Sequence, residues 1–303
     1  MDFRFLHTSD FRKWVILAPR RSLRPDVAKG TEHICPFCPG REANDEELYR
    51  VSKEATLDVR NWKLDKDPTS SSDWLIRVIP NKFPFTSVHE LIIHSPDHHK
   101  NIDELPREHV HQLLTVYRQR YQLHQDKGQV CLFHNRGIQA GESIPHAHTQ
   151  VTVVPSGVQI DAPLLLAPAG KEGVHTKYFH IFSPKVSQWP DEVWIVPKRS
   201  EKRFGDIDDE EITDLAFCLP RLVQLMDLRH GYEFPFNYFI HPGVNWYIRF
   251  IPRQKTIGGF EVGTGIYVNT QDPEETNSFL RQYFQATEVE IAPEHKASYA
   301  KHV

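Results

Sequence analysis

The chain has 303 residues, of which 39% are hydrophobic and 25% charged, which is the composition of a soluble globular protein with room for about two domains. The formal net charge of −4 argues against a general nucleic-acid-binding protein. No apolar run approaches the roughly 18 residues of a membrane helix, and the first residues lack a secretory signal, so we expect a cytoplasmic protein with no membrane partner.

The N-terminal region, up to about residue 85, combines strand-like pieces at 13–19 and 74–81 with a cysteine knuckle. Cys35 and Cys38 are separated by two residues and followed by Pro39. Such a pair is typical of half a zinc site or of a redox motif. A redox motif would need a helix directly after the first cysteine, and Pro39 disfavours one. The sequence therefore predicts zinc, with a turn that binds no metal as the alternative.

Zinc needs two further ligands, and the chain contains no second Cys-x-x-Cys pair, so histidines must complete the site. His98 lies in a turn after a predicted strand, and His146 lies at the start of another. His94, His99 and His134 compete with them, and spacing alone leaves the choice open.

Next come a strand at 90–94, an amphipathic helix that begins near Pro106, and strands at 129–135 and 146–154. In the last strand, His146 and His148 are two residues apart and so share a face. If His146 binds the metal, His148 can act as a nucleophile towards phosphorus. Ser143 and Gln150 could then bind phosphate oxygens. The alternative is a set of hydrogen-bonded polar residues at a strand edge.

A second unit repeats the order of strand, helix and two strands, at 191–197, 209–225, 234–241 and 245–252. Without a gap, Glu90 aligns with Glu192 and Leu113 with Leu215, 102 residues apart (192 − 90). We therefore predict an α+β fold of duplicated halves, at 1–160 and 175–303, joined by a Pro-, Ala- and Gly-rich linker at 156–173. The second copy has no paired histidines, so we expect the first to carry the chemistry.

Two further clusters could bind a ligand. Arg20, Arg21 and Arg24 follow the first strand and could contact phosphate, although a solvated turn explains this cluster better when it is taken alone. Glycines around Phe260 and Glu261 could bring the backbone close to a sugar, although a surface loop is the alternative.

Together these pieces resemble the galactose-1-phosphate uridylyltransferase family, the transferase branch of the histidine-triad superfamily. The resemblance covers nearly the whole chain and rests on RKWVILAPRRSLRP, CPFCPG, SPDH, NKFPF and FHNRG…AGESIPHAHTQ. It implies histidine-triad-like halves, each an antiparallel sheet with helices packed on it. It also implies a nucleotidyl-histidine intermediate and a homodimer.

The resemblance also implies roles for individual residues. Zinc, structural and one per chain, is assigned to Cys35, Cys38, His98 and His146, and the nucleophile is His148, assisted by Ser143 and Gln150. Nucleotide and phosphate contacts are assigned to Arg21, Arg24, Asn81 and Asn135, and the sugar side to Lys255, Phe260 and Glu261. Hydrolases of the superfamily usually carry a third histidine where this chain has Gln150, so the resemblance favours transfer over hydrolysis.

The chain departs from the family pattern in two places. Of a second metal site known in some members, only His241 remains, so we expect that site to be empty. The GGFEVGTG run is similar to ADP-glucose phosphorylase relatives. The predicted function is uridylyl transfer from UDP-glucose to a hexose 1-phosphate, with an ADP-sugar phosphorylase, a superfamily hydrolase or a non-catalytic nucleotide-sugar binder as alternatives.

Overall fold

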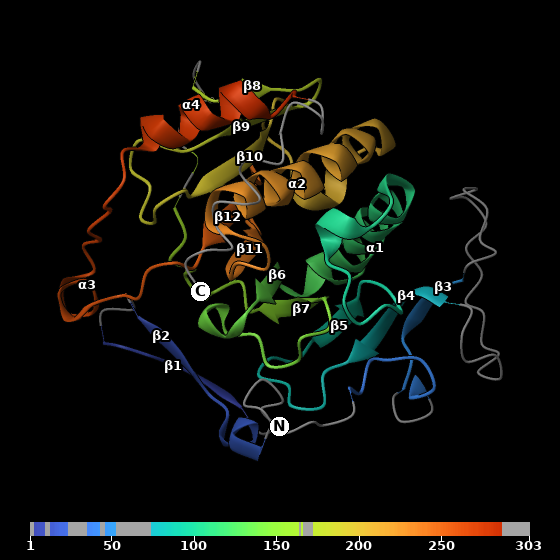
Figure 1. Ribbon diagram of the computed structural model, residues 1–303. Coiled ribbons are helices and arrows are strands. Elements are labelled where there is room, and N and C mark those ends of the chain that lie inside the picture. Colours follow the sequence, from blue (N-terminus) through green and yellow to red (C-terminus); the bar gives the residue numbers. More distant parts are fainter. Residues whose placement is uncertain are drawn as a thin grey trace.

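The computed structural model describes residues 3–9, 13–23, 35–42, 46–52, 74–163, 165 and 172–286 (Figure 1). Its centre is a ten-stranded antiparallel sheet, and a separate two-stranded hairpin lies near the N-terminus. The hairpin strands are β1 (Arg4–His7) and β2 (Trp14–Leu17). The large sheet comprises β3 (Tyr49–Ser52), β4 (Trp74–Pro80), β5 (His89–Ile93), β6 (Gln129–Arg136), β7 (His148–Val154), β8 (Val174–His175), β9 (Phe179–Phe182), β10 (Val193–Pro197), β11 (Phe236–Ile240) and β12 (Ile248–Pro252).

Four α-helices accompany these strands in the described part of the chain: α1 (Arg107–His124), α2 (Asp209–His230), α3 (Gly259–Thr264) and α4 (Pro273–Tyr283). The predicted α+β class is confirmed, as are both long amphipathic helices. The Gly-rich run, for which a surface loop was the alternative to a ligand-binding segment, contains the short helix α3. None of the described helices has the length and apolar character needed to cross a membrane.

The strand order shows the duplication directly. Read from its outer edge to the centre of the sheet, the N-terminal half has the order β3-β4-β5-β7-β6. Read in the same way, the C-terminal half has the order β8-β9-β10-β12-β11, which is the same arrangement. The halves meet where β6 pairs with β11, with His134 opposite Tyr238. α1 and α2 follow equivalent strands and lie against each other (Figure 1). The boundaries 1–160 and 175–303 stay a prediction, since part of the predicted linker lies outside the described residues.

The ungapped alignment of the two halves holds in the helices but not in the strands. Glu90 points towards α1, where it contacts Arg120 (2.5 Å) and His124 (2.8 Å). Glu192 points to the opposite face of the sheet, where it accepts hydrogen bonds from Arg249 (2.7 and 2.8 Å). Because side chains alternate along a strand, a shift of one residue reverses the face. The pairing of these two glutamates is therefore not a structural equivalence.

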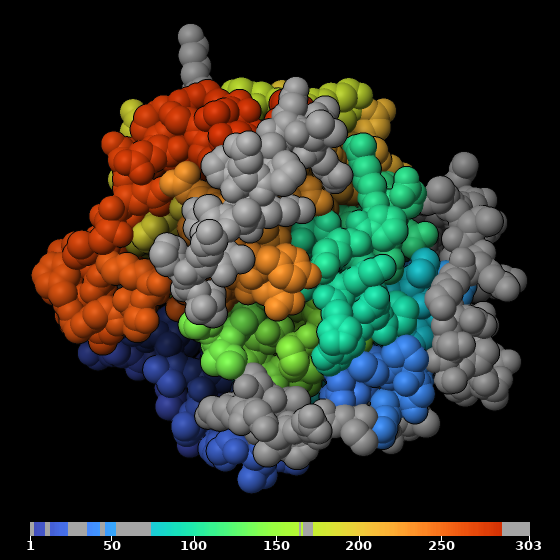
Figure 2. All heavy atoms as spheres, viewed as in Figure 1, coloured from blue at the N-terminus to red at the C-terminus, as the bar shows by residue number. Residues whose placement is uncertain are grey.

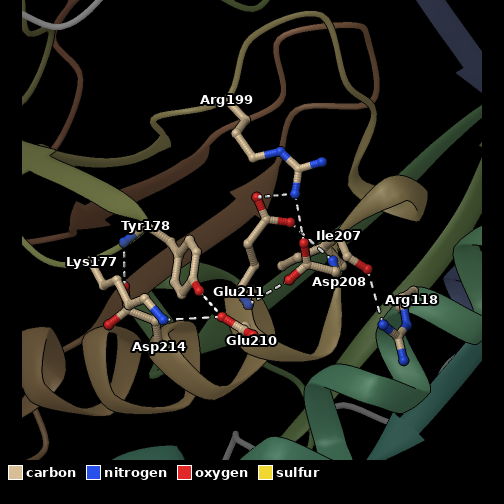
Figure 3. Close-up of polar contacts among 9 residues, drawn as sticks. All are labelled: Arg118, Lys177, Tyr178, Arg199, Ile207, Asp208, Glu210, Glu211 and Asp214. Atoms are coloured by element: carbon tan, nitrogen blue, oxygen red, sulfur yellow. Dashed lines mark hydrogen bonds and ion pairs between the residues drawn. The ribbon is translucent and has the colours of Figure 1, made fainter.

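The main core lies between α1, α2 and one face of the sheet, and it contains buried residues from both halves. The start of α2 is fixed by a capping box in which Asp208 accepts from Glu211 N and Glu211 accepts from Asp208 N, both at 2.9 Å (Figure 3). Arg118 of α1 binds Asp209 at 2.7 Å and the carbonyl of Ile207 at 3.0 Å. The two helices are thus joined at the same point where α2 begins.

Candidate active site

Four side chains converge on one point at the open face of the N-terminal half. The ligand atoms of Cys35, Cys38, His98 and His146 lie within 4.8 Å of one another, a group that could hold a metal ion. The Nδ1 atom of His146 lies 3.6 Å from the sulfur of Cys35 and 3.8 Å from that of Cys38, and His98 Nδ1 lies 3.4 Å from the latter. Zinc bound tetrahedrally, at about 2.3 Å from sulfur and about 2.0 Å from nitrogen, would set these atoms roughly 3.6 Å apart.

The protonation chemistry of the group also suits a cation. Burial raises the pKa of Cys35 to about 11, so a nearby positive charge is needed to hold the thiolate. Burial lowers the pKa of His146 to about 4, which keeps its imidazole in the neutral form that binds metals. The Nε2–H of His146 donates to the carbonyl of Ser95 (2.8 Å), which leaves Nδ1 as the lone-pair atom on the sulfur side.

The competing histidines lie elsewhere. His94 points into the core, where its Nε2 contacts Thr149 Oγ1 at 2.8 Å. His134 donates from Nδ1 to the carbonyl of His148 (2.8 Å). His99 packs against the His98 ring but is outside the group of four. Among the described residues, the structure therefore places His98 and His146 beside the two cysteines, a choice that spacing alone left open.

His148 is buried beside this group and has a defined tautomer. Its Nδ1–H donates to the carbonyl of His146 at 2.8 Å, so Nε2 carries the lone pair. The ring of Phe37, from the knuckle, meets the ring of His148 edge-on at 5.3 Å and that of His146 at 6.0 Å. β7 begins at His148, two residues later than predicted, because β5 pairs with it only from that residue onward.

Gln150 lies on the same face of β7 as His148, and its Oε1 contacts His89 Nε2 at 2.9 Å. Asn135 Oδ1 accepts from Asn237 Nδ2 of β11 (2.8 Å), so a residue of the C-terminal half holds this amide. Ser143 is buried in the loop before β7, and no hydrogen bond within the described part of the chain joins it to His148.

Two of the residues assigned to the nucleotide, Arg21 and Asn81, lie beside the loop that precedes β5. Arg21 donates to the carbonyl of Phe83 (2.7 Å), with its guanidinium 4.7 Å from the centre of the Phe85 ring. Asn81 Oδ1 accepts from the backbone N–H of Phe83 (2.8 Å). Arg24 lies outside the described residues.

A pocket of about 460 Å³ opens between this loop and the N-terminal segment. Its polar lining consists of two cationic side chains, one carboxylate, one amide, two hydroxyls and two histidines. The lining residues are Phe3, Arg20, Leu48, Pro80, Asn81, Lys82, Phe83, Pro84, Thr86, Ser87, Val88, His89, Glu90 and His124.

Two of the three residues assigned to the sugar, Lys255 and Glu261, contact each other. Lys255 Nζ lies 3.2 Å from Glu261 Oε1 and also donates to the carbonyl of Val268. Glu261 Oε2 accepts from Gly258 N at the start of α3 (3.1 Å). Phe260 is 55% exposed. In Figure 1 this segment projects from the body of the molecule.

Sequence reasoning missed a buried polar cluster beneath β7, made of His94, Tyr117, His134, Thr149 and Tyr238. The tyrosine hydroxyls lie 2.9 Å apart, and Tyr117 OH lies 2.5 Å from Thr149 Oγ1. It also missed His89 and Phe37. Tyr117 lies in the predicted amphipathic helix, but no local sequence pattern indicates that its hydroxyl is hydrogen-bonded. Among 18 histidines, nothing in sequence distinguishes His89.

The sequence is similar to those of known proteins. Residues 18–154 match the family model for the N-terminal domain of galactose-1-phosphate uridyl transferase. ADP-glucose phosphorylase of Arabidopsis thaliana is 27% identical over an alignment of 332 residues that covers 89% of this chain and 90% of that protein. Galactose-1-phosphate uridylyltransferase of Thermotoga maritima is 26% identical over 334 residues, covering 96% of this chain and all of that protein (100%).

The fold agrees with these matches. A crystal structure of the Arabidopsis thaliana ADP-glucose phosphorylase with bound ADP-glucose has a TM-score of 0.67 and 26% identity, and the match covers 92% of this chain and 99% of that one. The resemblance inferred from the motifs is confirmed: residues 18–154 match this family model, and most of the chain is similar in sequence and fold to an ADP-glucose phosphorylase and in sequence to a galactose-1-phosphate uridylyltransferase.

Proposed function

We propose that the protein is a nucleotidyltransferase that works in two steps through a nucleotidyl-histidine at His148. The observation that carries the proposal is the hydrogen bond from His148 Nδ1 to the His146 carbonyl, which leaves a lone pair on Nε2. In the first step Nε2 bonds to the α-phosphorus of a nucleoside-diphosphate sugar. The bond from that phosphorus to the bridging oxygen breaks, and sugar 1-phosphate leaves with the electron pair.

In the second step an oxygen of a phosphorylated acceptor attacks the same phosphorus, and the N–P bond breaks back to His148. Gln150 and Ser143 stabilise the charge on the phosphoryl oxygens, and removal of one such donor commonly costs about 2.7–4 kcal/mol of transition-state stabilisation. Asn81, Asn135, Arg21 and Arg24 contact the nucleotide, and Lys255, Phe260 and Glu261 contact the sugar.

Zinc is the proposed occupant of the group of four ligands. Cys35, Cys38, His98 and His146 would supply all four ligands of a tetrahedral zinc ion and would leave no position for water, so the metal's role would be structural. The metal would hold the knuckle, and with it Phe37, against the His148 ring.

For the substrates, we propose uridylyl transfer from UDP-glucose to a hexose 1-phosphate. An ADP-sugar phosphorylase, with inorganic phosphate as acceptor, is the second candidate, supported by the 27% identity to ADP-glucose phosphorylase across 89% of the chain. Incubation with UDP-glucose or ADP-glucose, each labelled on the α-phosphate, followed by denaturation, distinguishes the two by which label stays on the protein.

The matched control is His148→Asn, which keeps a hydrogen-bonding amide but removes the nucleophile. We expect no retained label and no exchange of label between substrates. If neither donor labels the wild-type protein, the proposal is wrong. If the wild-type protein and His148→Asn bind the ligand equally well and neither has activity, the chain is a binding protein. Release of the nucleotide in the absence of an acceptor would indicate a hydrolase.

We also propose that two copies of the chain form a homodimer. Apolar side chains are exposed on the hairpin, at Leu6 and Val15, and on the segment around α3, at Phe260, Val262 and Ile266. In Figure 2 both segments lie at the surface on the same side of the view. Exposed apolar patches of this kind mark interaction sites.

Light scattering after size-exclusion chromatography tests the assembly. Val262→Asp is expected to give monomers, whereas Val186→Asp, at an equally exposed valine in the turn after β9, is expected to leave the dimer intact. A monomeric wild-type protein would contradict the proposal.

A further inference from the structure

We infer that Asn237, on β11 of the C-terminal half, is a positioning residue that orients the side-chain amide of Asn135 so that its N–H groups, and not its oxygen, face the nucleotide phosphate. The inference deepens the proposed function and rests on it. Asn237 lies directly opposite Asn135, where β6 and β11 join the two halves of the sheet. The contacts of these two amides determine where each oxygen and each nitrogen lies.

Two neighbours of opposite character orient the amide of Asn237. The guanidinium of Arg253 can only donate, and its Nη1 lies 2.9 Å from Oδ1 of Asn237. The backbone carbonyl of Ala140 can only accept, and it lies 2.8 Å from Nδ2 of Asn237. Both contacts require the same orientation, with the oxygen of Asn237 towards Arg253 and its nitrogen towards Ala140.

The amide of Asn135 is then determined in turn. The Nδ2 atom of Asn237 has a second N–H to donate, and the Asn135 atom that lies 2.8 Å from it is therefore the oxygen. The NH₂ group of Asn135 is on the other branch, where a Cβ added to Gly141 would lie 4.0 Å from Nδ2. The Asn135 side chain is partly exposed, and no hydrogen bond within the described part of the chain uses this NH₂ group.

This NH₂ group lies on the face of the sheet that carries His148. His134 of β6 pairs with Thr149 of β7, and both side chains contact Tyr238 in the buried cluster beneath the sheet. Asn135 and His148 are the next residues along each strand, so both point to the opposite face. A donor in this place stabilises the negative charge on the phosphoryl oxygens, whereas a rotated amide would turn its carbonyl oxygen towards them.

The orienting residues all belong to the C-terminal half, and Arg253 is itself held in place. Its guanidinium lies 4.6 Å from the centre of the Trp189 ring, and its backbone N–H donates to the carbonyl of Pro235 at 2.7 Å. The half of the chain without paired histidines therefore acts on the reaction through Asn237, which determines the orientation of a donor beside the nucleophile.

The test is a double-mutant cycle on the rate at which the wild-type protein, Asn237→Ala, Asn135→Ala and the double variant form the nucleotidyl-histidine at saturating donor. Asn135→Ala removes the donor and is expected to slow this step by roughly 100-fold. Asn237→Ala is expected to slow it by roughly 10-fold, because a mobile amide still adopts the productive orientation part of the time. In the Asn135→Ala background, Asn237→Ala should have no further effect. Two effects that multiply in full would overturn the inference, since Asn237 would then act on the fold and not through Asn135.

Asn277→Ala is the matched control. Asn277 also accepts from a backbone N–H, that of Ser183 (2.8 Å), and donates to the carbonyl of the same residue (3.0 Å). It lies on α4, against β8 and β9 at the outer edge of the C-terminal half. Because Asn277 is more deeply buried than Asn237, its variant should lower the midpoint of urea unfolding at least as much, with an unchanged rate of adduct formation. An equal loss of rate in Asn277→Ala would overturn the inference, since the rate would then follow stability.

A readout that does not depend on turnover separates failure of this inference from failure of the proposed function. Nitrogen-15 spectra of the side-chain amides, with Asn135 and Asn237 assigned from their alanine variants, report how fast each amide exchanges hydrogen with water. We expect slow exchange at Asn237 and fast exchange at Asn135. In Asn237→Asp the new carboxylate can only accept, so the Asn135 amide should turn over and its exchange should slow.

This pattern supports the inferred orientation even if no nucleotide adduct forms, and the failure then lies with the proposed function alone. Slow exchange at Asn135 in the wild-type protein, or an unchanged rate of exchange in Asn237→Asp, overturns the inference, whatever the activity.

Discussion

The hydroxyl of Thr149 offers a sharp test of the polar cluster beneath the nucleophile. Thr149 is fully buried, and its Oγ1 lies 2.8 Å from His94 Nε2, 2.5 Å from Tyr117 OH and 3.2 Å from Tyr238 OH. Valine has nearly the same shape but no hydroxyl. Thr149→Val therefore removes one buried hydrogen-bond partner from each of His94 and Tyr117, which still contact each other at 2.9 Å.

Loss of one partner from a buried polar group costs about 1–3 kcal/mol of unfolding free energy. We expect Thr149→Val to fall in this range, because the two tyrosine hydroxyls still bond to each other at 2.9 Å. Thr152→Val is the matched control. Thr152 lies in the same strand on the opposite face, is also buried, and makes no side-chain hydrogen bond within the described residues.

Urea unfolding of both variants, followed by tryptophan fluorescence on metal-loaded protein, measures the difference. A lower midpoint for Thr149→Val than for Thr152→Val, at an unchanged slope, is the expected result. Equal midpoints would refute the reasoning, since they would show that the hydroxyl contributes no net stability despite its three close contacts.

Three further predictions concern the metal, the pH dependence and the backbone. Cys38→Ala should remove bound zinc, measured by elemental analysis, whereas Cys131→Ala, at a thiol outside the group of four, should keep it; metal-free wild-type protein would contradict this. Burial lowers the pKa of His134 from its ordinary value of about 6.5 to about 3. Below pH 6.5 the unfolded chain therefore binds a proton that the folded protein excludes, and as the pH is lowered this histidine reduces the unfolding free energy by about 1.4 kcal/mol per pH unit. His134→Asn retains a donor near the Nδ1 position, and the unfolding free energy of this variant, measured with urea, should fall less between pH 7 and pH 5 than that of the wild-type protein. An equal fall in both proteins would count against the prediction. Gly137 has a φ of +81°, and an added Cβ would lie 2.8 Å from the Cβ of Pro235. Gly137→Ala should therefore lower the unfolding free energy by about 1–3 kcal/mol in the same urea assay. An unchanged unfolding free energy would show that the loop can shift to make room.

The sequence by itself determined the features that are local. The spacing of Cys35 and Cys38 predicts a metal knuckle because two sulfurs in one turn must converge. Helical periodicity predicts α1 and α2 because it records which face is buried. The histidines around Ala147 point to chemistry because residues two apart on a strand share a face.

The tertiary structure decided everything that depends on pairing between distant segments. It brought His98 and His146, and neither His94 nor His134, to the sulfurs, and it placed His89 beside Gln150 across two strands. It also set Glu90 and Glu192 on opposite faces. The physical reason is register: a strand shifted by one residue exposes its other face, and nothing within a single strand reports which partner it will meet or in which alignment.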